Sequence, residues 1–255
     1  MPTYILRKEF HDEKAFMEDI KWCCICTAIW SSLYLVIKLT KFHRILIKDG
    51  SMEQVKDLEN RVVSSLHGLG ALLLSGYHCM FVRTTCGELN SVYQRNVMIF
   101  SVSYFAYDLI AMAFEGILDA AMIIHHPLCV FGFVLPLYEN ISGNYAMMAL
   151  FSSEISNPPM HMRHIMRLTG RRYTKAYELS EITFILLYFF GRIVIAFPIA
   201  YSNLVCPVNH MIFKLTCVGL MTQSMYFALQ MLQVLQRRYK EILHRKQLGI
   251  RLNWF

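Results

Sequence analysis

The chain has 255 residues, 55% of them hydrophobic and only 17% charged, and a formal net charge of +7. Soluble domains carry about 25% charged residues, so we expect lipid rather than water around much of this chain. The positive charge does not indicate nucleic-acid binding, because all but three of the Lys and Arg residues lie between apolar runs or in the two tails. Such a distribution is typical of membrane proteins beside an anionic cytosolic leaflet.

A membrane-spanning helix needs about 20 mostly apolar residues. Seven runs approach this requirement, at residues 22–39, 62–82, 97–114, 120–138, 145–161, 182–201 and 208–235. We therefore predict an all-α, polytopic membrane bundle of about seven transmembrane helices. The fourth and fifth runs are the weakest of the seven, because both contain ionisable residues and proline near their middles.

The positions of Lys and Arg predict the orientation of these spans. With the N-terminus outside, the inner segments hold sixteen of these residues and the outer segments hold six. This excess predicts a cytosolic C-terminus. The first 20 residues are rich in Asp and Glu and have no long apolar core, so we expect no cleavable signal peptide and expect the first span to direct insertion.

Eight cysteines raise the question of disulfides or metal. Most lie within apolar runs, where a free Cys packs as a small hydrophobic residue, and no two C-x-x-C units occur to suggest zinc. Cys86 and Cys206 fall in outer loops of the predicted topology, where an oxidising lumen could join them. The sequence gives no distance between the two.

Several ionisable or polar residues lie within the predicted spans, where each costs a few kcal/mol on insertion scales. They are His67, Asp108, His125, His126, Glu154, Asn157 and Arg192. One interpretation is structural, with Arg192 paired to Glu154 or Asp108. The other is a polar cavity inside the bundle, which better explains why the cost recurs in so many spans.

His125 and His126 are candidate catalytic residues. Neighbouring helical residues point about 100° apart, so we expect one of them to face the cavity and the other to contact an adjacent helix. Pro127 cannot donate a backbone hydrogen bond, which predicts a kink or break at the pair. A histidine oriented by Asp108 or Glu154 could act as a general base. We do not expect a metal, because adjacent histidines lack the i, i+4 spacing of helical zinc motifs.

These residues, taken together with their neighbours, resemble the signature of the TLC-domain family of ceramide synthases and translocation-associated membrane proteins, and are most similar to the small TLC domain-containing proteins 4 and 5. The matching positions are Arg61 to Ser64 with His67, Tyr104, Tyr107 and Asp108, His125 and His126 with Gly132, Phe151 to Pro158 with Met162 and Arg163, and Gly191 with Arg192. We divide the chain accordingly into residues 1–51 (tail, first span and start of a basic loop), 52–245 (TLC domain) and 246–255 (basic tail).

The resemblance implies about six helices around a lipid-accessible cavity, plus one N-terminal helix, in the endoplasmic reticulum or another internal membrane. It implies that His67, Tyr107, Asp108, Glu154, Asn157 and Arg192 line that cavity. In ceramide synthases the double histidine belongs to the motif that acylates a sphingoid amine from acyl-CoA. A second His-Asp pair follows in those enzymes, whereas this chain has Ser152 to Asn157 there.

The sequence therefore favours a non-enzymatic protein that binds or senses a membrane lipid and influences lipid composition, without a cofactor. The alternative is an acyltransferase with acyl-CoA as substrate and His125 or His126 as general base. A seven-span receptor fits poorly, because its Asn-Pro element would lie in the fifth span without the expected aromatic residue. The oligomeric state stays open.

Overall fold

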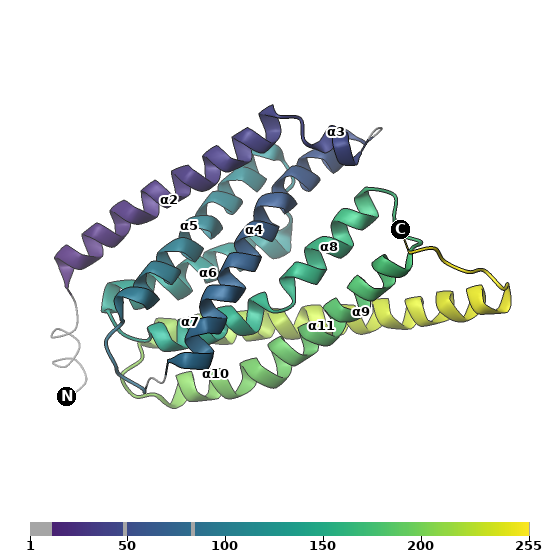
Figure 1. Cartoon of the computed structure of the whole chain (residues 1–255). Helices are drawn as coiled ribbons and strands as arrows, with labels where there is room; N and C mark the ends of the chain where they lie inside the picture. Colours follow the sequence, from purple (N-terminus) through teal and green to yellow (C-terminus); the bar gives the residue numbers. More distant parts are fainter. Residues whose placement is uncertain (1–11, 48–49, 83–84, 255) are drawn as a thin grey trace.

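A computed structural model gives the structure of residues 12–47, 50–82 and 85–254; most of the predicted N-terminal tail, residues 1–11, lies outside the described residues. Within these ranges every extended element is helical, and the helices run roughly along one axis of an elongated bundle (Figure 1). In chain order they are α2 (Glu13–Leu39), α3 (His43–Leu46), α4 (Met52–Phe81), α5 (Val92–Glu115), α6 (Ala120–Glu139), α7 (Gly143–Glu154), α8 (Asn157–Leu168), α9 (Lys175–Phe189), η1 (Phe190–Ile195), α10 (Ala196–Val205) and α11 (Met211–Gln247).

The helix starts follow from capping residues in the sequence. Ser51 and Ser91 each form a capping box with the Gln three residues later, at the starts of α4 and α5. Asp119 and Thr174 accept hydrogen bonds from first-turn amides of α6 and α9. Such caps satisfy backbone donors that the helix itself leaves without partners, and here they fix where each helix enters the bundle.

Five of the helical stretches in the described residues are long and apolar enough to cross a membrane: α2, α5, α6, the α9–η1–α10 stretch and α11. This confirms the prediction of an all-α membrane bundle, while the predicted number of seven spans is not confirmed by length and composition alone. α4 is less apolar because it buries polar side chains such as Glu59, Asn60 and His67 towards the protein. α7 and α8 have 12 residues each, too few to cross singly.

The interruptions of the helices lie in other places than Pro127. A kink or break was predicted at His125 and His126; α6 is continuous through Pro127, so the helix is not broken there. A single proline is tolerated in membrane helices when the freed carbonyl finds another partner. The fifth predicted span is interrupted instead, because Pro158 and Pro159 open α8 just after the end of α7. The sixth contains a π-helical turn, η1, around Arg192.

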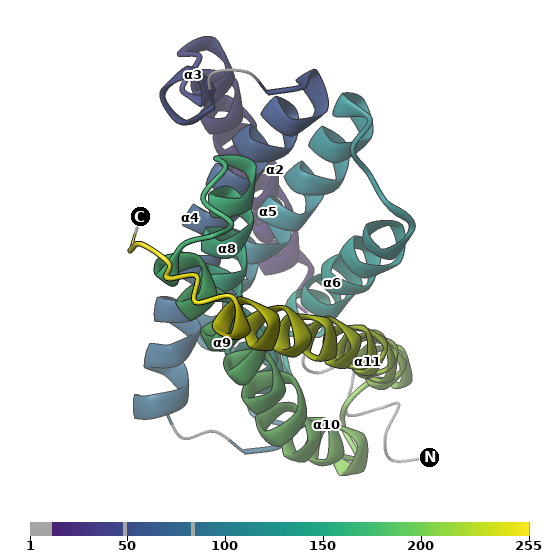
Figure 2. The ribbon, with the colours of Figure 1, turned by 90° about the vertical axis from the view of Figure 1, so that its right-hand side faces the viewer.

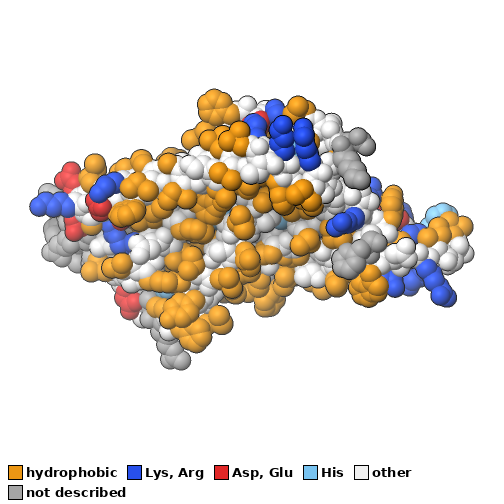
Figure 3. Space-filling model, turned by 45° about the horizontal axis from the view of Figure 1, so that its top comes forward, with side chains coloured by type: hydrophobic (Ala, Val, Ile, Leu, Met, Phe, Trp, Pro, Cys, Tyr) orange, Lys and Arg blue, Asp and Glu red, His pale blue; other side chains and the backbone are white. Residues whose placement is uncertain are grey.

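The two ends of the bundle differ in chemistry. We call one the basic end: it holds α3, the turn between α8 and α9, and the distal part of α11. Figure 3 shows Lys and Arg side chains towards this end, others beside Asp and Glu at the opposite end, and an apolar band across the middle of the visible face. Seen from the basic end in Figure 2, the C-terminal segment returns from α11 towards α9, where the Lys175 amide donates to the Asn253 carbonyl at 2.8 Å.

The opposite end is closed by a disulfide between Cys86 and Cys206, whose Cα atoms are 5.9 Å apart. It joins the α4–α5 connection to the α10–α11 connection, which are 120 residues apart in sequence. The possibility raised by the positions of these two cysteines is therefore confirmed. The other six cysteines are free.

Helix α2 packs along α5 at one edge of the bundle (Figure 1). The Thr27 hydroxyl donates to the Ser103 carbonyl at 3.3 Å, and the Ser103 hydroxyl donates back to the Cys23 carbonyl at 3.1 Å. Asp19 and Arg95 form an ion pair at 2.5 Å near the disulfide end. Small polar side chains thus hold α2 in place while much of its apolar surface remains exposed.

Candidate functional site

A cavity of about 540 Å³ runs through the interior and is lined by α4 to α11. Its size falls in the range of small-molecule sites, roughly 300–1,000 Å³. The structure brings seven of the predicted site residues to its wall: His67, Asp108, His125, His126, Glu154, Asn157 and Arg192. Tyr107 does not line the cavity; it is buried behind the wall, where its hydroxyl donates to Asn60 at 3.1 Å.

His126 is held directly by α5 and by its own helix, and indirectly by α4. Its Nε2 lies 2.7 Å from Asp108 Oδ2, and its Nδ1 lies 3.2 Å from the Met122 carbonyl of the preceding turn. The second oxygen of Asp108 accepts from the Asn60 amide at 2.7 Å. Both ring nitrogens therefore face acceptors, and His126 is a poor candidate for receiving a proton from a substrate.

His125 is oriented differently, with its ring at 88° to that of His126. Gln223 donates its side-chain amide to the Ala121 carbonyl at 2.9 Å, so the Gln223 oxygen accepts from His125 Nδ1 at 3.1 Å. This assigns the proton of neutral His125 to Nδ1 and leaves Nε2 as an acceptor, which lies 3.4 Å from the Cys129 thiol and can accept its weak hydrogen bond. Both histidines line the cavity and both contact an adjacent helix, so the expected division of roles between them is not observed.

Glu154 ends α7 with only 3% of its surface exposed. Its Oε2 accepts one hydrogen bond, from the Asn157 amide at 2.7 Å. Gly68 of α4 lies against it: a Cβ at that position would stand 3.1 Å from the carboxylate oxygen. The helix break before Pro158 thus places a carboxylate deep in the bundle without a basic partner within ion-pair distance in the described residues.

Arg192 reaches the same cavity from η1. Its guanidinium donates to the Ser153 carbonyl at 3.3 Å and lies near the Ser224 hydroxyl at 3.5 Å, while Nε is buried without a partner. Gly191 makes this position possible, because a Cβ there would stand 2.3 Å from the Ser152 carbonyl oxygen of α7. The expected pairing of Arg192 with Glu154 or Asp108 is not found among the described ion pairs.

Sequence reasoning missed several residues of the cavity wall. Asn60 lies just before the predicted second span, and Gln223 looked like an ordinary polar residue of the last one. His161 was noted only as the end of a span, yet it lines the cavity with a buried, unpartnered Nδ1. His67 stacks on Tyr104 with ring centroids 3.8 Å apart, and its Nε2 is also unpartnered.

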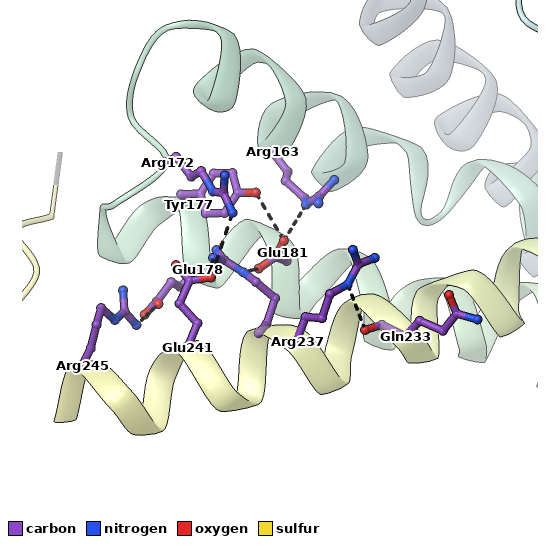
Figure 4. Close-up of polar contacts among 10 residues, drawn as sticks. Arg163, Arg172, Tyr177, Glu178, Glu181, Gln233, Arg237, Glu241 and Arg245 are labelled. Atoms are coloured by element: carbon purple, nitrogen blue, oxygen red, sulfur yellow. Dashed lines mark hydrogen bonds and ion pairs between the residues drawn. The ribbon is translucent and has the colours of Figure 1, made fainter. Parts of the chain in front are cut away.

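At the basic end the cavity meets a set of ion pairs that we call the basic-end cluster: Arg163, Arg172, Tyr177, Glu178, Glu181, Arg238, Glu241 and Arg245. Figure 4 shows Arg163 and Glu181 pointing towards one another beside Tyr177. Glu181 accepts from Arg163 at 2.9 Å and from Arg238 at 2.5 Å. Arg238 also donates to Glu241, and Arg245 to Glu178. These contacts tie α8, α9 and α11 together.

No group of three or more His, Cys, Asp or Glu side chains in the described part of the chain could hold a metal ion. A bundle of apolar helices with polar groups converging on an internal cavity defines a polytopic membrane protein. Residues 57–237 match the family model of the TLC domain. The chain therefore belongs to the TLC-domain family, as the sequence resemblance indicated.

Proposed function

We propose that this protein binds a membrane lipid in its internal cavity and thereby influences membrane lipid composition. The observation that carries the proposal is the unpaired state of Glu154 and Arg192, which face one cavity at membrane depth. Intramembrane charges are costly and mark ligand or ion pathways. Neither residue forms an ion pair among the described residues, so a polar lipid head group is the partner that the cavity lacks.

We further propose that α4 and the α7–α8 pair complete a set of seven spans, and that the basic end faces the cytosol. Two separate features support this orientation: the excess of Lys and Arg at one end, and the disulfide at the other, where an oxidising lumen would preserve it. Placement in the endoplasmic reticulum, and membership of the group of TLC domain-containing proteins 4 and 5, are parts of the same proposal.

Mass spectrometry of the lipids that co-purify with the protein tests the main proposal. We expect a defined lipid class to be enriched over the bulk membrane in the wild type and lost in Glu154→Ala. Glu53→Ala, an exposed residue in the first turn of α4, is the matched control and should retain the lipid. Identical lipid profiles in all three proteins, equal to the bulk membrane, would contradict lipid binding in the cavity.

One observation favours acyl transfer as a second candidate: His125 lines the cavity, and its Nε2, the acceptor nitrogen, has only the weak Cys129 thiol as a hydrogen-bond partner. It could accept the proton of an amine or hydroxyl as that group attacks the thioester carbonyl of acyl-CoA, and the thiolate would then leave with a proton. An assay with radiolabelled acyl-CoA on purified wild type and His125→Ala tests this. Acylated product only with the wild type supports the enzyme; no product, or equal product, refutes it.

A further inference from the structure

Eight Asp, Glu and Arg side chains line the cavity in the described part of the chain. They are Asp57, Asp108, Asp119, Glu154, Glu181, Arg61, Arg163 and Arg192. In a medium of low dielectric constant each charge needs a compensating partner nearby. The partners of these residues therefore show which charges the fold already satisfies and which it leaves for a ligand.

Six of the eight have partners within the protein or lie at an exposed turn. Asp57 pairs with Arg61 at 2.9 Å and with His164 at 2.8 Å. Arg163 pairs with Glu181 at 2.9 Å. Asp108 contacts His126, and Asp119 accepts the Met122 amide as the cap of α6. Within the described residues, only Glu154 and Arg192 keep neither an ionic partner nor such a surface position.

These two residues are close in the fold but do not neutralise each other directly. Arg192 donates to the carbonyl of Ser153, the residue next to Glu154. Yet no nitrogen of Arg192 lies within the 4.0 Å ion-pair distance of a Glu154 oxygen. Arg192 contacts a carbonyl, a hydroxyl and the Tyr188 ring, whose centroid lies 5.8 Å from its guanidinium carbon, and none of these carries a negative charge. The cavity is thus lined by a cation and an anion that form no ion pair with each other.

The charge balance restricts the ligand. An anionic head group would compensate Arg192 and leave Glu154 facing a second negative charge. A cationic head group would compensate Glu154 and leave Arg192 facing a second positive charge. A neutral head group would leave both charges without an ionic partner. A head group that carries both a positive and a negative charge compensates Glu154 and Arg192 together.

We propose that the cavity ligand is a zwitterionic amphiphile, whose anionic group contacts Arg192 and whose cationic group contacts Glu154. This inference rests on the proposed lipid binding and specifies its ligand class. The anion could be a phosphate or a carboxylate, because a guanidinium binds either in bidentate fashion. A primary ammonium suits Glu154, since it can donate a hydrogen bond to the carboxylate oxygen that Asn157 leaves available.

Competition measured by native mass spectrometry tests the head-group preference. The purified full chain is offered amphiphiles with one common chain length: lysophosphatidylethanolamine, an N-alkylglycine, lysophosphatidic acid, an alkylamine and a monoacylglycerol. We expect the two zwitterions to bind at least about tenfold more tightly than the other three. The ratio between the two zwitterions distinguishes phosphate from carboxylate as the anion.

Variants that remove the charge of Glu154 or Arg192 test which charged group of the ligand each residue binds. Glu154→Gln should bind the anionic probe at least as well as the zwitterions, and Arg192→Gln should do the same for the alkylamine. The double variant, which carries neither charge, should bind the monoacylglycerol best. Arg237→Gln, an exposed residue of α11 that does not line the cavity, should keep the wild-type order.

The possible outcomes distinguish failure of the zwitterionic-ligand proposal from failure of the lipid-binding proposal. Binding of all five probes with equal affinity, unchanged by the substitutions, would leave lipid binding standing and refute the zwitterionic ligand. Preference for a purely anionic or purely cationic probe in the wild type would also refute it. Failure of every probe to bind would refute both proposals.

Discussion

Two groups of charged side chains border the same cavity and have different environments. In the basic-end cluster, Glu181 accepts hydrogen bonds from Arg163 and Arg238 while Tyr177 lies beside both guanidinium groups. In the interior, Glu154 has one amide donor and Arg192 has only neutral partners. Both groups contain buried carboxylates and arginines. From this difference we infer that the first group stabilises the fold, and we propose that the second binds a ligand.

The largest loss of stability should come from disrupting the ion pairs of the basic-end cluster. Glu181→Ala removes the shared acceptor of two arginines and leaves Arg238, which is 9% exposed, without compensation from α9. Loss of one partner from a buried ion pair costs about 3–5 kcal/mol. Chemical unfolding of the purified protein should show a loss of that order, with Glu53→Ala as the unaffected control. An unchanged unfolding midpoint would contradict a structural role for the basic-end cluster.

The disulfide should be the next largest contributor, because it closes a loop of 120 residues at the end opposite the cluster. Replacing Cys86 and Cys206 with Ser should lower the free energy of unfolding by about 2–5 kcal/mol. Replacing the free, exposed Cys24 with Ser should have no such effect. On non-reducing gels the wild type should change mobility after reduction and the double variant should not. Equal mobilities before and after reduction of the wild type would contradict the bond.

The contact between η1 and α7 can be tested through Gly191. Gly191→Ala places a Cβ against the Ser152 carbonyl and Ile155 Cγ2, at 2.3 and 2.7 Å, so one of the two segments must move. Overpacking of this kind costs about 1–3 kcal/mol. The matched control is Gly132→Ala, whose Cβ would stand 3.5 Å from Thr216 Cγ2, an ordinary contact. Equal melting temperatures for the two variants would mean that the close approach is not needed.

The smallest change in stability should come from substitution of Glu154, the residue whose loss we expect to reduce lipid binding most. Glu154→Gln removes a buried charge that no ion pair compensates, so the unfolding free energy of the lipid-free protein should change by less than about 1 kcal/mol, or rise. Lipid retention should fall in the same variant. A destabilisation as large as that of Glu181→Ala would place Glu154 with the structural group and remove the distinction drawn between the two.

Much of the fold follows from the sequence, because apolar runs, capping residues and the tandem proline at 158–159 act locally. The membrane bundle was predicted from the apolar runs alone, and the order of these runs placed Cys86 and Cys206 in loops on the same side. The helix does not break at Pro127, since one missing backbone donor does not end a helix whose neighbours support it. α4 begins at Met52, ahead of the apolar run at 62–82, because its first turns carry polar residues such as Asn60 that hydropathy alone does not assign to a helix.

The sequence predicted which residues line the cavity better than it predicted which of them contact one another. Ionisable residues at membrane depth identified seven residues of the cavity wall. Which of them touch depends on the rotation of each helix about its axis, and no single sequence specifies this rotation. Asp108 therefore emerged as the partner of His126 rather than of Arg192, and Gln223, from a helix 98 residues away in sequence, fixes the tautomer of His125.

Photo-crosslinking with a zwitterionic single-chain phospholipid, labelled by a diazirine beside its head group, tests the central claim most directly. If the cavity holds the head group between Glu154 and Arg192, peptides from α7, η1 and the facing part of α11 should carry the label in the wild type. The label should decrease in the Glu154→Gln/Arg192→Gln double variant. Labelling confined to the outer apolar faces of the bundle, and equal in both proteins, would contradict an internal lipid site.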